Sequence, residues 1–501
     1  MSQRCTLLAC VAALAAAGCT TVGPDYKRPE LPLPATYRGA EAAPTAPAAP
    51  AAPAAPAAPA AAGAASFGEL AWASVFPDPD LRELIRTALQ QNLDVRVAAS
   101  RILQAQSQVT IAASPQWPAV VGSVDAPYST TTGSDRPSPD SSFQPQVGLG
   151  VAWELDFWGR FVRSTQAAQA QLLASEDGRY AVMATLVAQV GQAYLTLRAL
   201  DLTLELSQRT VGTRRQSLDL VQARVDGGVA GILDVRQAEN LLYSATKTIP
   251  DLQRLIEQQE NFINTLLGQN PGPVVRGRPL DQQIAAPALP PGLPTQLLTR
   301  RPDIRAAEQQ LVAANAQIGV AMALLYPQVT LSGFAGAGSS TISGANFGPY
   351  GVFSLLPAVT LPIFNAGRLQ ANVDYNEALA QEAALRYQQT LQQALREVSD
   401  ALIGVRKLRE FREQQELLVK ALDDASQIAT LRYEGGVSSF LEVLDTDRQL
   451  FDAQRDLVVA KRDESVAVVL LYKALGGGWQ KDAGTAAAGR PTTTALAGGA
   501  P

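Results

Sequence analysis

The 501-residue chain contains no histidine, only three cysteines and only three methionines. Without histidine it lacks the commonest general acid–base group and the commonest metal ligand. Cys5 and Cys10 fall in an N-terminal apolar segment, so Cys19 alone remains for the rest of the chain and no disulfide is expected. With 41 basic and 46 acidic residues and no basic cluster, nucleic-acid binding is not expected either. These absences indicate a protein that is not an enzyme and needs no metal or cofactor.

Residues 1–18 are typical of a cleaved secretory signal, because an apolar run from Thr6 to Ala17 ends in small residues. The sequence Ala16–Gly18 before Cys19 resembles a bacterial lipobox, with Ala16 in place of the usual leucine. The resemblance implies a covalent diacylglycerol and an N-acyl lipid such as palmitate on Cys19. Thr20, where an aspartate would favour the inner membrane, favours the outer membrane by the same resemblance. A plain cleaved signal with an incidental cysteine is the alternative.

Two segments of biased composition flank the part of the chain that can form a core. Residues 19–65 comprise the predicted lipidated segment and an Ala/Pro tract, whose repeated AAP triplets favour an extended polyproline II spacer. Residues 479–501 are rich in Gly, Ala and Thr, which predicts a disordered tail.

The region between these segments reads as two tandem copies of one unit, 66–270 and 271–478. The stretch Val225–Leu241 echoes Tyr433–Leu450, and Gly227 maps onto Gly435 with an offset of 208 residues. Other pairs keep nearly the same offset: Asp94-Val95-Arg96 with Asp303-Ile304-Arg305, Pro115-Gln116 with Pro327-Gln328, Gly159-Arg160 with Gly367-Arg368, and Gly268 with Gly476.

Long helices are predicted around the glycine pairs Gly227-Gly228 and Gly435-Gly436. No proline occurs from Val147 to Ile249 or from Ile363 to Arg490, and apolar residues recur there at three- and four-residue steps. The 67 residues from Gly367 to Tyr433 would form a rod of about 100 Å at about 1.5 Å per residue. A Gly-Gly pair supplies positive φ without steric cost, so each pair is expected to make a sharp reversal between two helices.

Shorter helices are predicted elsewhere in each copy. One runs over 81–113 and is capped by Asp78-Pro79-Asp80, a second covers 306–325, and a third covers 440–475. A further helix is expected after the first glycine pair.

Each copy also predicts one β-hairpin, at about 116–156 and about 328–364, which gives four strands per chain. In Gln144–Asp156 apolar residues alternate with small or acidic ones. The stretches 129–142 and 338–349 read as loops. Strands of this length and alternation fit a transmembrane β-barrel, and no apolar run near 20 residues is evident beyond the signal.

Four strands cannot close a useful barrel, and lipid does not tolerate open strand edges, so several copies must share one barrel. Two, three or four copies in a symmetric ring would give 8, 12 or 16 strands. The alternative is a soluble sheet packed on the helices.

Three carboxylates, Glu442, Asp445 and Asp447, follow the second glycine pair. Glu442 and Asp445 are three residues apart and therefore share a helix face. In a ring of chains this pair would form a cation-attracting constriction. An ordinary solvated helix face is the other interpretation, and spacing alone favours it. Glu154 and Asp156 are expected to face the barrel lumen or to mark its periplasmic rim.

Several long stretches resemble one family, the outer membrane factors, which are the TolC-like channels of tripartite efflux pumps. The resemblance lies in CTTVGPDYKRP at 19–29, WELDFWGR at 153–160, LLTRRPDIRAAEQQLVAANAQIGVA at 297–321, LPIFNAGR at 361–368 and both glycine turns. It points to the lipoprotein (NodT-type) branch and covers nearly everything from Cys19 to Gly478 except the Ala/Pro tract.

The resemblance implies an α+β membrane protein: a homotrimer with a 12-stranded outer-membrane β-barrel, four strands per chain, continued by a long periplasmic α-helical barrel. It implies passive conduction of drugs, solvents or metal ions to the exterior, received from a periplasmic membrane-fusion adaptor and an inner-membrane pump of the RND type. The alternatives are an outer-membrane duct of a type I protein secretion system, a diffusion porin, and an envelope lipoprotein without a pore.

By position, the resemblance also assigns roles to residues near the glycine pairs. Glu442 and Asp445 match the acidic pair of the periplasmic gate, where the family often has two aspartates. Tyr433 matches a tyrosine of the closed-state network. Gly227, Gly228, Gly435 and Gly436 match the turns on which the adaptor docks.

Overall fold

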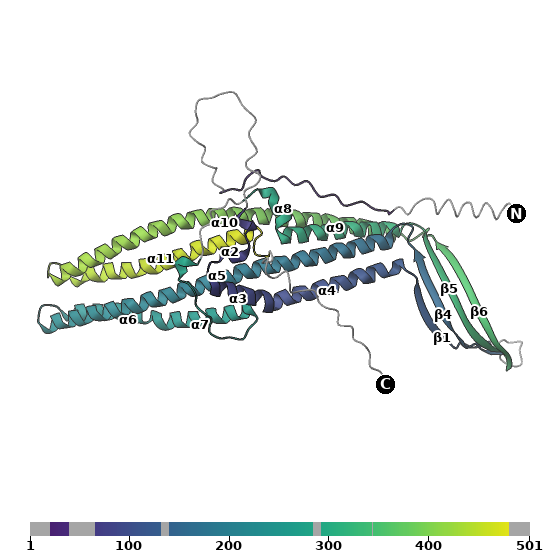
Figure 1. The fold of residues 1–501 in the computed structure, drawn as a ribbon, viewed down its shortest axis with the longest axis horizontal. Coiled ribbons are helices and arrows are strands. Elements are labelled where there is room, and N and C mark those ends of the chain that lie inside the picture. Colours follow the sequence, from purple (N-terminus) through teal and green to yellow (C-terminus); the bar gives the residue numbers. More distant parts are fainter. Residues whose placement is uncertain (1–20, 40–65, 132–139, 284–291, 343, 480–501) are drawn as a thin grey trace, which may run out of the picture. The chain divides into compact units, whose positions relative to one another are not determined.

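A computed structural model describes residues 21–39, 66–131, 140–283, 292–342 and 344–479 (Figure 1). The predicted signal peptide, Cys19, the Ala/Pro tract and the tail from residue 480 onward lie outside the described residues. The chain divides into two compact units: unit 1 holds residues 1–31, 100–177 and 306–389, and unit 2 holds residues 32–99, 178–305 and 390–501.

Unit 1 is built on one antiparallel sheet (Figure 1). Its described strands are β1 (Ala119–Asp125), β2 (Tyr128–Thr131), β3 (Asp140–Phe143), β4 (Gln146–Leu155), β5 (Gln328–Ile342) and β6 (Ala345–Thr360). β1 pairs with β4 and β2 with β3, β5 pairs with both β4 and β3, and β6 pairs with β5. The prediction of four strands is therefore corrected to six strands that follow four paths, with β1–β2 and β3–β4 each forming one interrupted path.

Two prolines explain the interruptions. Pro127 separates β1 from β2 and Pro145 separates β3 from β4, and neither residue has an N–H to donate to the ladder. Their carbonyls accept hydrogen bonds from the backbone N–H groups of Gln144 (3.0 Å) and Ser339 (3.0 Å), so pairing resumes on either side of each break. The strands also extend into the predicted loops 129–142 and 338–349, which are shorter than expected.

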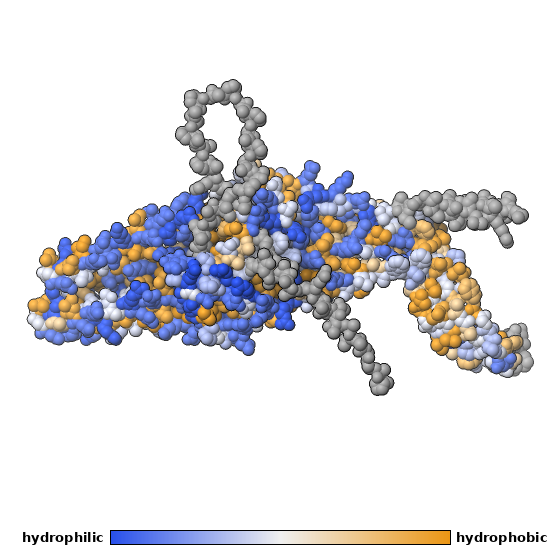
Figure 2. Space-filling view, viewed as in Figure 1, coloured by the Kyte–Doolittle hydropathy of each residue, from blue (hydrophilic) through white to orange (hydrophobic). Residues whose placement is uncertain are grey.

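The two faces of this sheet differ in character. Residues directly opposite one another in a ladder share a face, so Leu149 of β4, Ala335 of β5 and Phe353 of β6 lie together, next to Val147 and Val151. These β4 and β6 side chains are exposed, and Figure 2 shows hydrophobic residues along the strands. We call this the apolar face.

The other face, called here the small-residue face, carries Gly148, Gly150, Ala152, Glu154, Thr330 and Ser332, together with the ring of Phe334. The predicted alternation of β4 is therefore confirmed.

The helices occupy both units. The longer ones are α3 (Pro79–Gln91), α4 (Leu93–Ala113), α5 (Arg160–Asp226), α6 (Ile232–Thr246), α7 (Thr248–Leu267), α9 (Pro302–Ala323), α10 (Arg368–Glu434) and α11 (Phe440–Ala474). Short helices are α2 (Trp72–Val75), α8 (Leu297–Arg300) and the 3-10 turns η1 (Phe67–Glu69), η2 (Ser114–Gln116), η3 (Leu280–Gln282) and η4 (Pro294–Gln296). α5 and α10 each have 67 residues, and the order helix, strands, 67-residue helix, turn and helix occurs twice.

Two of the predicted helices are each divided into two shorter helices. Asn92 divides 81–113 into α3 and α4: its side-chain oxygen accepts from the N–H of Asp94 (2.9 Å) and so caps α4. After the first glycine pair, α6 and α7 meet at Lys247 instead of forming one helix. The predicted cap at Asp78 is confirmed, since its carboxylate accepts from the N–H of Asp80 (3.0 Å).

One described helix, α5, contains an 18-residue stretch that is long and apolar enough to cross a membrane by length and composition alone. This corrects the expectation that no such stretch exists. Because 56% of that stretch is buried inside the protein, packing against neighbouring helices is sufficient to explain its composition.

Arg301, at the start of α9, joins three elements of unit 2. Its buried guanidinium donates to Asp303 Oδ2 (2.6 Å), to Glu397 Oε2 on α10 (2.8 Å) and to the carbonyl of Ala474 at the end of α11 (3.1 Å). Burial by itself would raise the pKa of the Asp303 carboxyl, but the hydrogen bond and the charge of Arg301 lower that pKa below its usual value. The three acceptors together satisfy a cation that burial would otherwise destabilise.

We expect Arg301→Leu to lower the free energy of unfolding by about 3–5 kcal/mol, because it leaves two carboxylates and a carbonyl without their partner. Since the folded pKa of Asp303 is depressed, the wild-type contribution is complete above about pH 4 and is lost as pH falls through the folded pKa. Thermal unfolding at several pH values measures both effects. Arg254→Leu, which removes an exposed i,i+3 pair with Asp251 on α7, is the control and should leave the unfolding temperature unchanged. Equal effects of the two substitutions would contradict the assignment.

Candidate functional site

The two glycine turns have the same hydrogen-bonding pattern in unit 2. At the first turn, the N–H of Gly228 donates to the carbonyl of Val225 (2.9 Å) and the N–H of Val229 to that of Arg224 (2.9 Å). At the second turn, Gly436 donates to Tyr433 (3.0 Å) and Val437 to Arg432 (2.9 Å). This is the Schellman arrangement, which satisfies the last carbonyls of a helix before the chain reverses.

Only the second glycine of each pair adopts positive φ, with +75° at Gly228 and +73° at Gly436. The positive φ expected at each pair is therefore present, and the second glycine supplies it. A Cβ at Gly435 would make ordinary contacts with the carbonyls of Leu431 (3.4 Å) and Arg432 (3.8 Å). Gly227 and Gly435 are helix-terminal residues, and Gly228 and Gly436 make the turns.

A small hydrophobic core holds the four helices together next to these turns. Its buried members come from α5, α6, α10 and α11, and they are Val221, Val235, Ala238, Ala429, Tyr433, Phe440 and Val443. We call this set the tip core. It brings residues that are more than 200 positions apart in the chain into one cluster, which joins the hairpin of the first copy to that of the second.

Tyr433, a sequence-predicted site residue, is part of the tip core and is only 5% exposed. Its ring lies 5.2 Å from the ring of Phe440 and 4.6 Å from the guanidinium of Arg224. Burial raises the pKa of Tyr433, the charge of Asp234 raises it further, and Arg224 opposes both. The phenolic oxygen has no hydrogen-bond partner among the described residues of this chain. A buried polar atom without a hydrogen-bond partner is unusual in a protein and calls for an explanation.

Glu442 and Asp445, the predicted acidic pair, lie half-exposed on α11. Glu442 is 3.6 Å from Arg432 across the second turn. Asp445 accepts from Arg448 (3.1 Å) and from Gln449 (2.6 Å) on the same helix. The structure thus places one arginine beside each carboxylate, a feature that the sequence analysis did not consider. The i,i+3 spacing of Asp445 and Arg448 in the sequence could have predicted the second of these ion pairs.

Asp447 has a different environment from the other two carboxylates. It accepts a 2.8 Å hydrogen bond from Arg214 of α5, whose side chain is buried and also donates to the carbonyl of Leu241 (2.8 Å). The Arg214 guanidinium lies over the ring of Phe451 at 5.0 Å. Sequence reasoning missed Arg214, because no local pattern relates it to a carboxylate 233 residues further along the chain.

Exposed apolar side chains surround both turns at equivalent positions of the two copies. They are Val229 and Leu233 at the first turn, and Val437 and Leu441 at the second. Figure 2 shows hydrophobic residues at the surface of this end of the helices. Exposed apolar groups around a well-ordered turn are typical of a surface that binds another protein.

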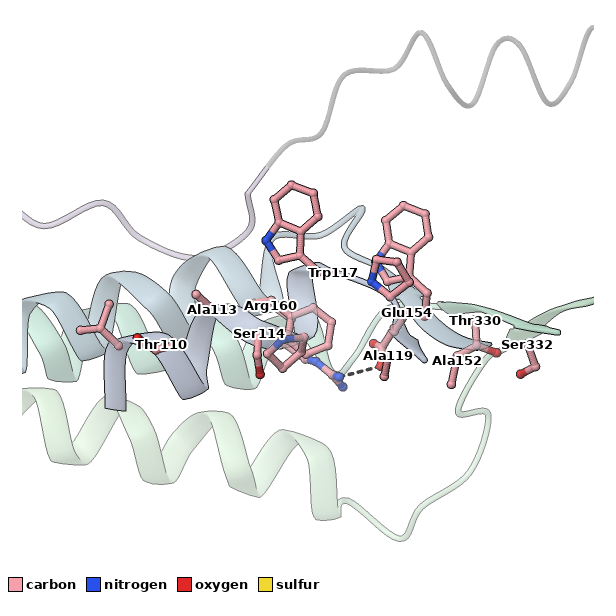
Figure 3. A pocket seen from close by; sticks show the side chains of 15 residues that line it. Thr110, Ala113, Ser114, Trp117, Ala119, Ala152, Glu154, Arg160, Thr330 and Ser332 are labelled. Atoms are coloured by element: carbon pink, nitrogen blue, oxygen red, sulfur yellow. Dashed lines mark hydrogen bonds and ion pairs between the residues drawn. The ribbon is translucent and has the colours of Figure 1, made fainter. Parts of the chain in front are cut away.

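Unit 1 contains a recess of about 1220 Å³ where α4, the strands and the start of α5 meet (Figure 3). We call it the junction recess. Its walls are Val109, Thr110, Ala113, Ser114, Pro115, Trp117, Pro118, Ala119, Ala152, Trp153, Glu154, Arg160, Phe161, Thr330 and Ser332. Most of this lining is apolar, and the main charged group is the ion pair of Glu154 with Arg160, at 2.6 Å.

Glu154 and Asp156 therefore play separate roles. Glu154 lies on the small-residue face and lines the junction recess. Asp156 instead accepts hydrogen bonds from the N–H groups of Phe161 (2.9 Å) and Val162 (3.0 Å), which stabilises the N-terminus of α5. Among the described residues, no group of three or more Asp, Glu or Cys side chains is arranged to hold a metal ion.

Solved structures with the same architecture define the class of protein. The outer-membrane channel OprN is 30% identical with a TM-score of 0.79, and the alignment covers 92% of this chain and 100% of that chain. The open state of the Neisseria gonorrhoeae MtrE outer membrane channel is 30% identical with a TM-score of 0.79, covering 92% and 99%. The fold is that of the TolC-like outer-membrane channels, which confirms the predicted fold class.

Sequence comparison gives the family. The outer membrane efflux protein family matches residues 84–269 and 293–477. The probable efflux pump outer membrane protein TtgC of Pseudomonas putida is 35% identical over 481 residues, 95% of this chain and 96% of that protein. The cation efflux system protein CusC of Escherichia coli is 31% identical over 478 residues, 95% and 99%. This chain belongs to the outer membrane efflux protein family, so the resemblance and the predicted function in outer-membrane efflux are confirmed.

The geometry of the turns predicts unequal effects for substitutions at neighbouring glycines. Gly436→Ala forces alanine toward φ +73° at a cost of about 1–2 kcal/mol, which should speed hydrogen exchange of the turn amides about 5–30-fold. Gly435→Ala is the control and should leave exchange unchanged or slower, because alanine is favoured over glycine at a helix end. Hydrogen–deuterium exchange with mass spectrometry on the turn peptide measures this, and equal acceleration in both variants would contradict it.

Proposed function

We propose that three copies of this chain form a channel that passively conducts solutes across the outer membrane. A periplasmic adaptor and an inner-membrane pump, of the RND type, deliver the solutes to the helical end. The observation that carries this proposal is the four-path sheet, whose apolar face is exposed and whose two outermost paths each pair on one side only. The chain itself performs no chemistry and uses no cofactor, since the pump supplies the energy.

The sheet edges support a closed ring of copies. The path of β1 and β2 and the path of β6 each leave one row of backbone N–H and C=O groups unpaired within the described chain. In lipid such groups must be paired, and joining β1 of one copy to β6 of the next achieves this. Three copies of four paths make a 12-stranded barrel.

The adaptor docks on the two turns, Gly227-Gly228 and Gly435-Gly436. The support is the equivalent geometry of the turns together with the exposed Val229, Leu233, Val437 and Leu441 around them. A partner that covers these side chains removes apolar surface from water, at about 25 cal/mol per Å².

Glu442 and Asp445 form the periplasmic gate with Tyr433. In a ring, three copies of this half-exposed pair surround the axis and attract cations. The unpaired hydroxyl of Tyr433 takes a partner from a neighbouring copy in the closed state. Adaptor binding opens the gate by preferring the open arrangement of the helices.

The exported solutes belong to the classes that the relatives carry. TtgC in one Pseudomonas putida strain is named a toluene efflux pump protein, and CusC a cation efflux protein. We propose drugs, solvents or metal ions as substrates, with the choice among them made by the pump.

Single-channel conductance in a lipid bilayer tests the gate. Wild-type protein should show a small, cation-preferring conductance. Glu442→Ala combined with Asp445→Ala should raise the conductance and reduce cation preference, because it removes both charges from the constriction and frees Arg432 and Arg448 from their pairs.

The control removes two carboxylates from an exposed helix away from the tip core. Asp251→Ala with Glu257→Ala on α7 changes the net charge equally and should leave conductance and selectivity unchanged. A large wild-type conductance that is indifferent to both pairs of substitutions would instead indicate a porin that is open at rest.

We also propose that Cys19 carries the diacylglycerol and N-acyl lipid. The segment that follows it is held on unit 1: Asp25 pairs with Arg163 (2.8 Å), and Arg28 pairs with Glu308 (2.7 Å). Thr21 packs against Gly159, between β4 and α5, where a Cβ on the glycine would lie 2.6 Å from its methyl group.

Growth with labelled palmitate should label the wild-type chain and leave Cys19→Ala unlabelled. Because Cys19 is the only cysteine after the signal, no second site can take up the lipid by the same chemistry. Label retained in Cys19→Ala would refute the assignment.

A further inference from the structure

Residues Leu361–Phe364 follow β6 and carry the most exposed large apolar side chains of the sheet region. Ile363 is 91% exposed and Phe364 is 89% exposed. Both precede α10, so they lie at a junction between a strand and a helix rather than in a loop at the far end of the hairpin. Two adjacent bulky apolar side chains left this exposed indicate a missing contact.

The junction recess lies over β1, β4 and β5 of the same sheet. It is formed around the end of α4 and the start of β1, and Figure 3 shows Ser114, Trp117 and Ala119 on its rim. β4 and β5 separate β1 from β6. The recess reaches across β4 to Thr330 and Ser332 of β5, but Phe364 of the same chain is not among the residues that line it.

Edge pairing between copies brings these two features together. β6 ends at Thr360 where its chain turns to α10, and β1 begins at Ala119 where its chain leaves η2. An antiparallel ladder that pairs these edges along their length aligns the end of β6 with the beginning of β1. Phe364 of one copy then lies beside Ser114–Pro118 of the next.

The alternation of side chains selects Phe364 over its neighbour. Thr360 is opposite Gln328 and Ala358 is opposite Thr330, so both lie on the small-residue face that lines the recess. Pro362 favours an extended residue before it, and alternation from Thr360 returns Phe364 to that face and Ile363 to the apolar face. The recess offers Trp117 and Phe161 as aromatic neighbours.

We propose that Phe364 of each copy fills the junction recess of the next copy and so locks the strand–helix junctions of the channel around the ring. The proposal rests on the ring of copies put forward above, and it names a contact that edge pairing alone does not require. The contact is heterologous, with different surfaces on its two sides, as a closed ring demands.

Cysteine crosslinking in the full-length lipidated protein tests the contact. Cys19 is the only other cysteine after the signal, so Ser114→Cys with Phe364→Cys introduces a defined pair. A short bifunctional maleimide should link chains into dimers and trimers on a denaturing gel. The control pair, Ser114→Cys with Phe353→Cys, uses a phenylalanine that is 80% exposed on the apolar face and should remain monomeric on the gel.

A second variant measures what the contact contributes. Phe364→Ala should dissociate from trimer to monomer in detergent at a lower temperature than wild type, whereas Phe353→Ala should match wild type. Native mass spectrometry reports the assembly separately. Trimers that form normally, do not crosslink through residues 114 and 364, and keep their dissociation temperature in Phe364→Ala would overturn this contact while leaving the proposed channel intact. A wild type that is monomeric in membranes would overturn both.

Discussion

The pairing of backbone hydrogen-bonding groups is the constraint on which the rest of unit 1 depends. β5 is paired on both sides, whereas β1 and β6 are paired on one side only. Both edge strands contribute exposed side chains to the apolar face. Water could solvate open edges, but lipid cannot, so the same apolar face that suits a membrane makes the open edges untenable. The sequence of one chain therefore encodes a surface that is complete only in a ring. Small residues of the other face, such as Gly148 and Gly336, make room for the ring of Phe334, which lies on that face.

In unit 2, the energies of two kinds of interaction determine which groups near the glycine turns can move. The tip core joins four helices through buried apolar side chains, and disrupting such packing costs several kcal/mol for each large side chain removed. The pairs of Glu442 with Arg432 and of Asp445 with Arg448 are half-exposed, and such pairs contribute about 0–1 kcal/mol each. Rearranging the two carboxylates therefore costs little free energy while the tip core stays intact. On the proposal that these carboxylates form a gate, a docking partner needs only a small difference in affinity between the closed and open arrangements to open it.

Much of this architecture follows from local sequence signals. The glycine pairs, the long proline-free stretches and the two-residue alternation of β4 each depend on neighbours within a few positions, and the helices and strands they predict are present. The interruptions at Pro127 and Pro145 carried a usable signal as well, since proline cannot donate to a ladder. Arg214 and the tip core could not be predicted in this way, because they join residues more than 200 positions apart. The role of Asp156 as a helix cap depends on the bend that follows β4, which composition does not specify.

The glycine turns of the two copies have the same geometry, but charged residues at equivalent positions differ between the copies. This difference explains the ion pair that joins the first copy to the second. Arg214 of the first copy corresponds to Leu422 of the second, and Asp447 of the second corresponds to Glu239 of the first, which pairs locally with Arg236 instead. The first copy therefore supplies the arginine, Arg214, and the second copy supplies the carboxylate, Asp447, and no equivalent pair forms between Leu422 and Glu239. A buried arginine without its carboxylate is strongly unfavourable, so this pair favours the arrangement in which α5 faces α11. Two identical copies would have no such preference, and their hairpins could exchange places.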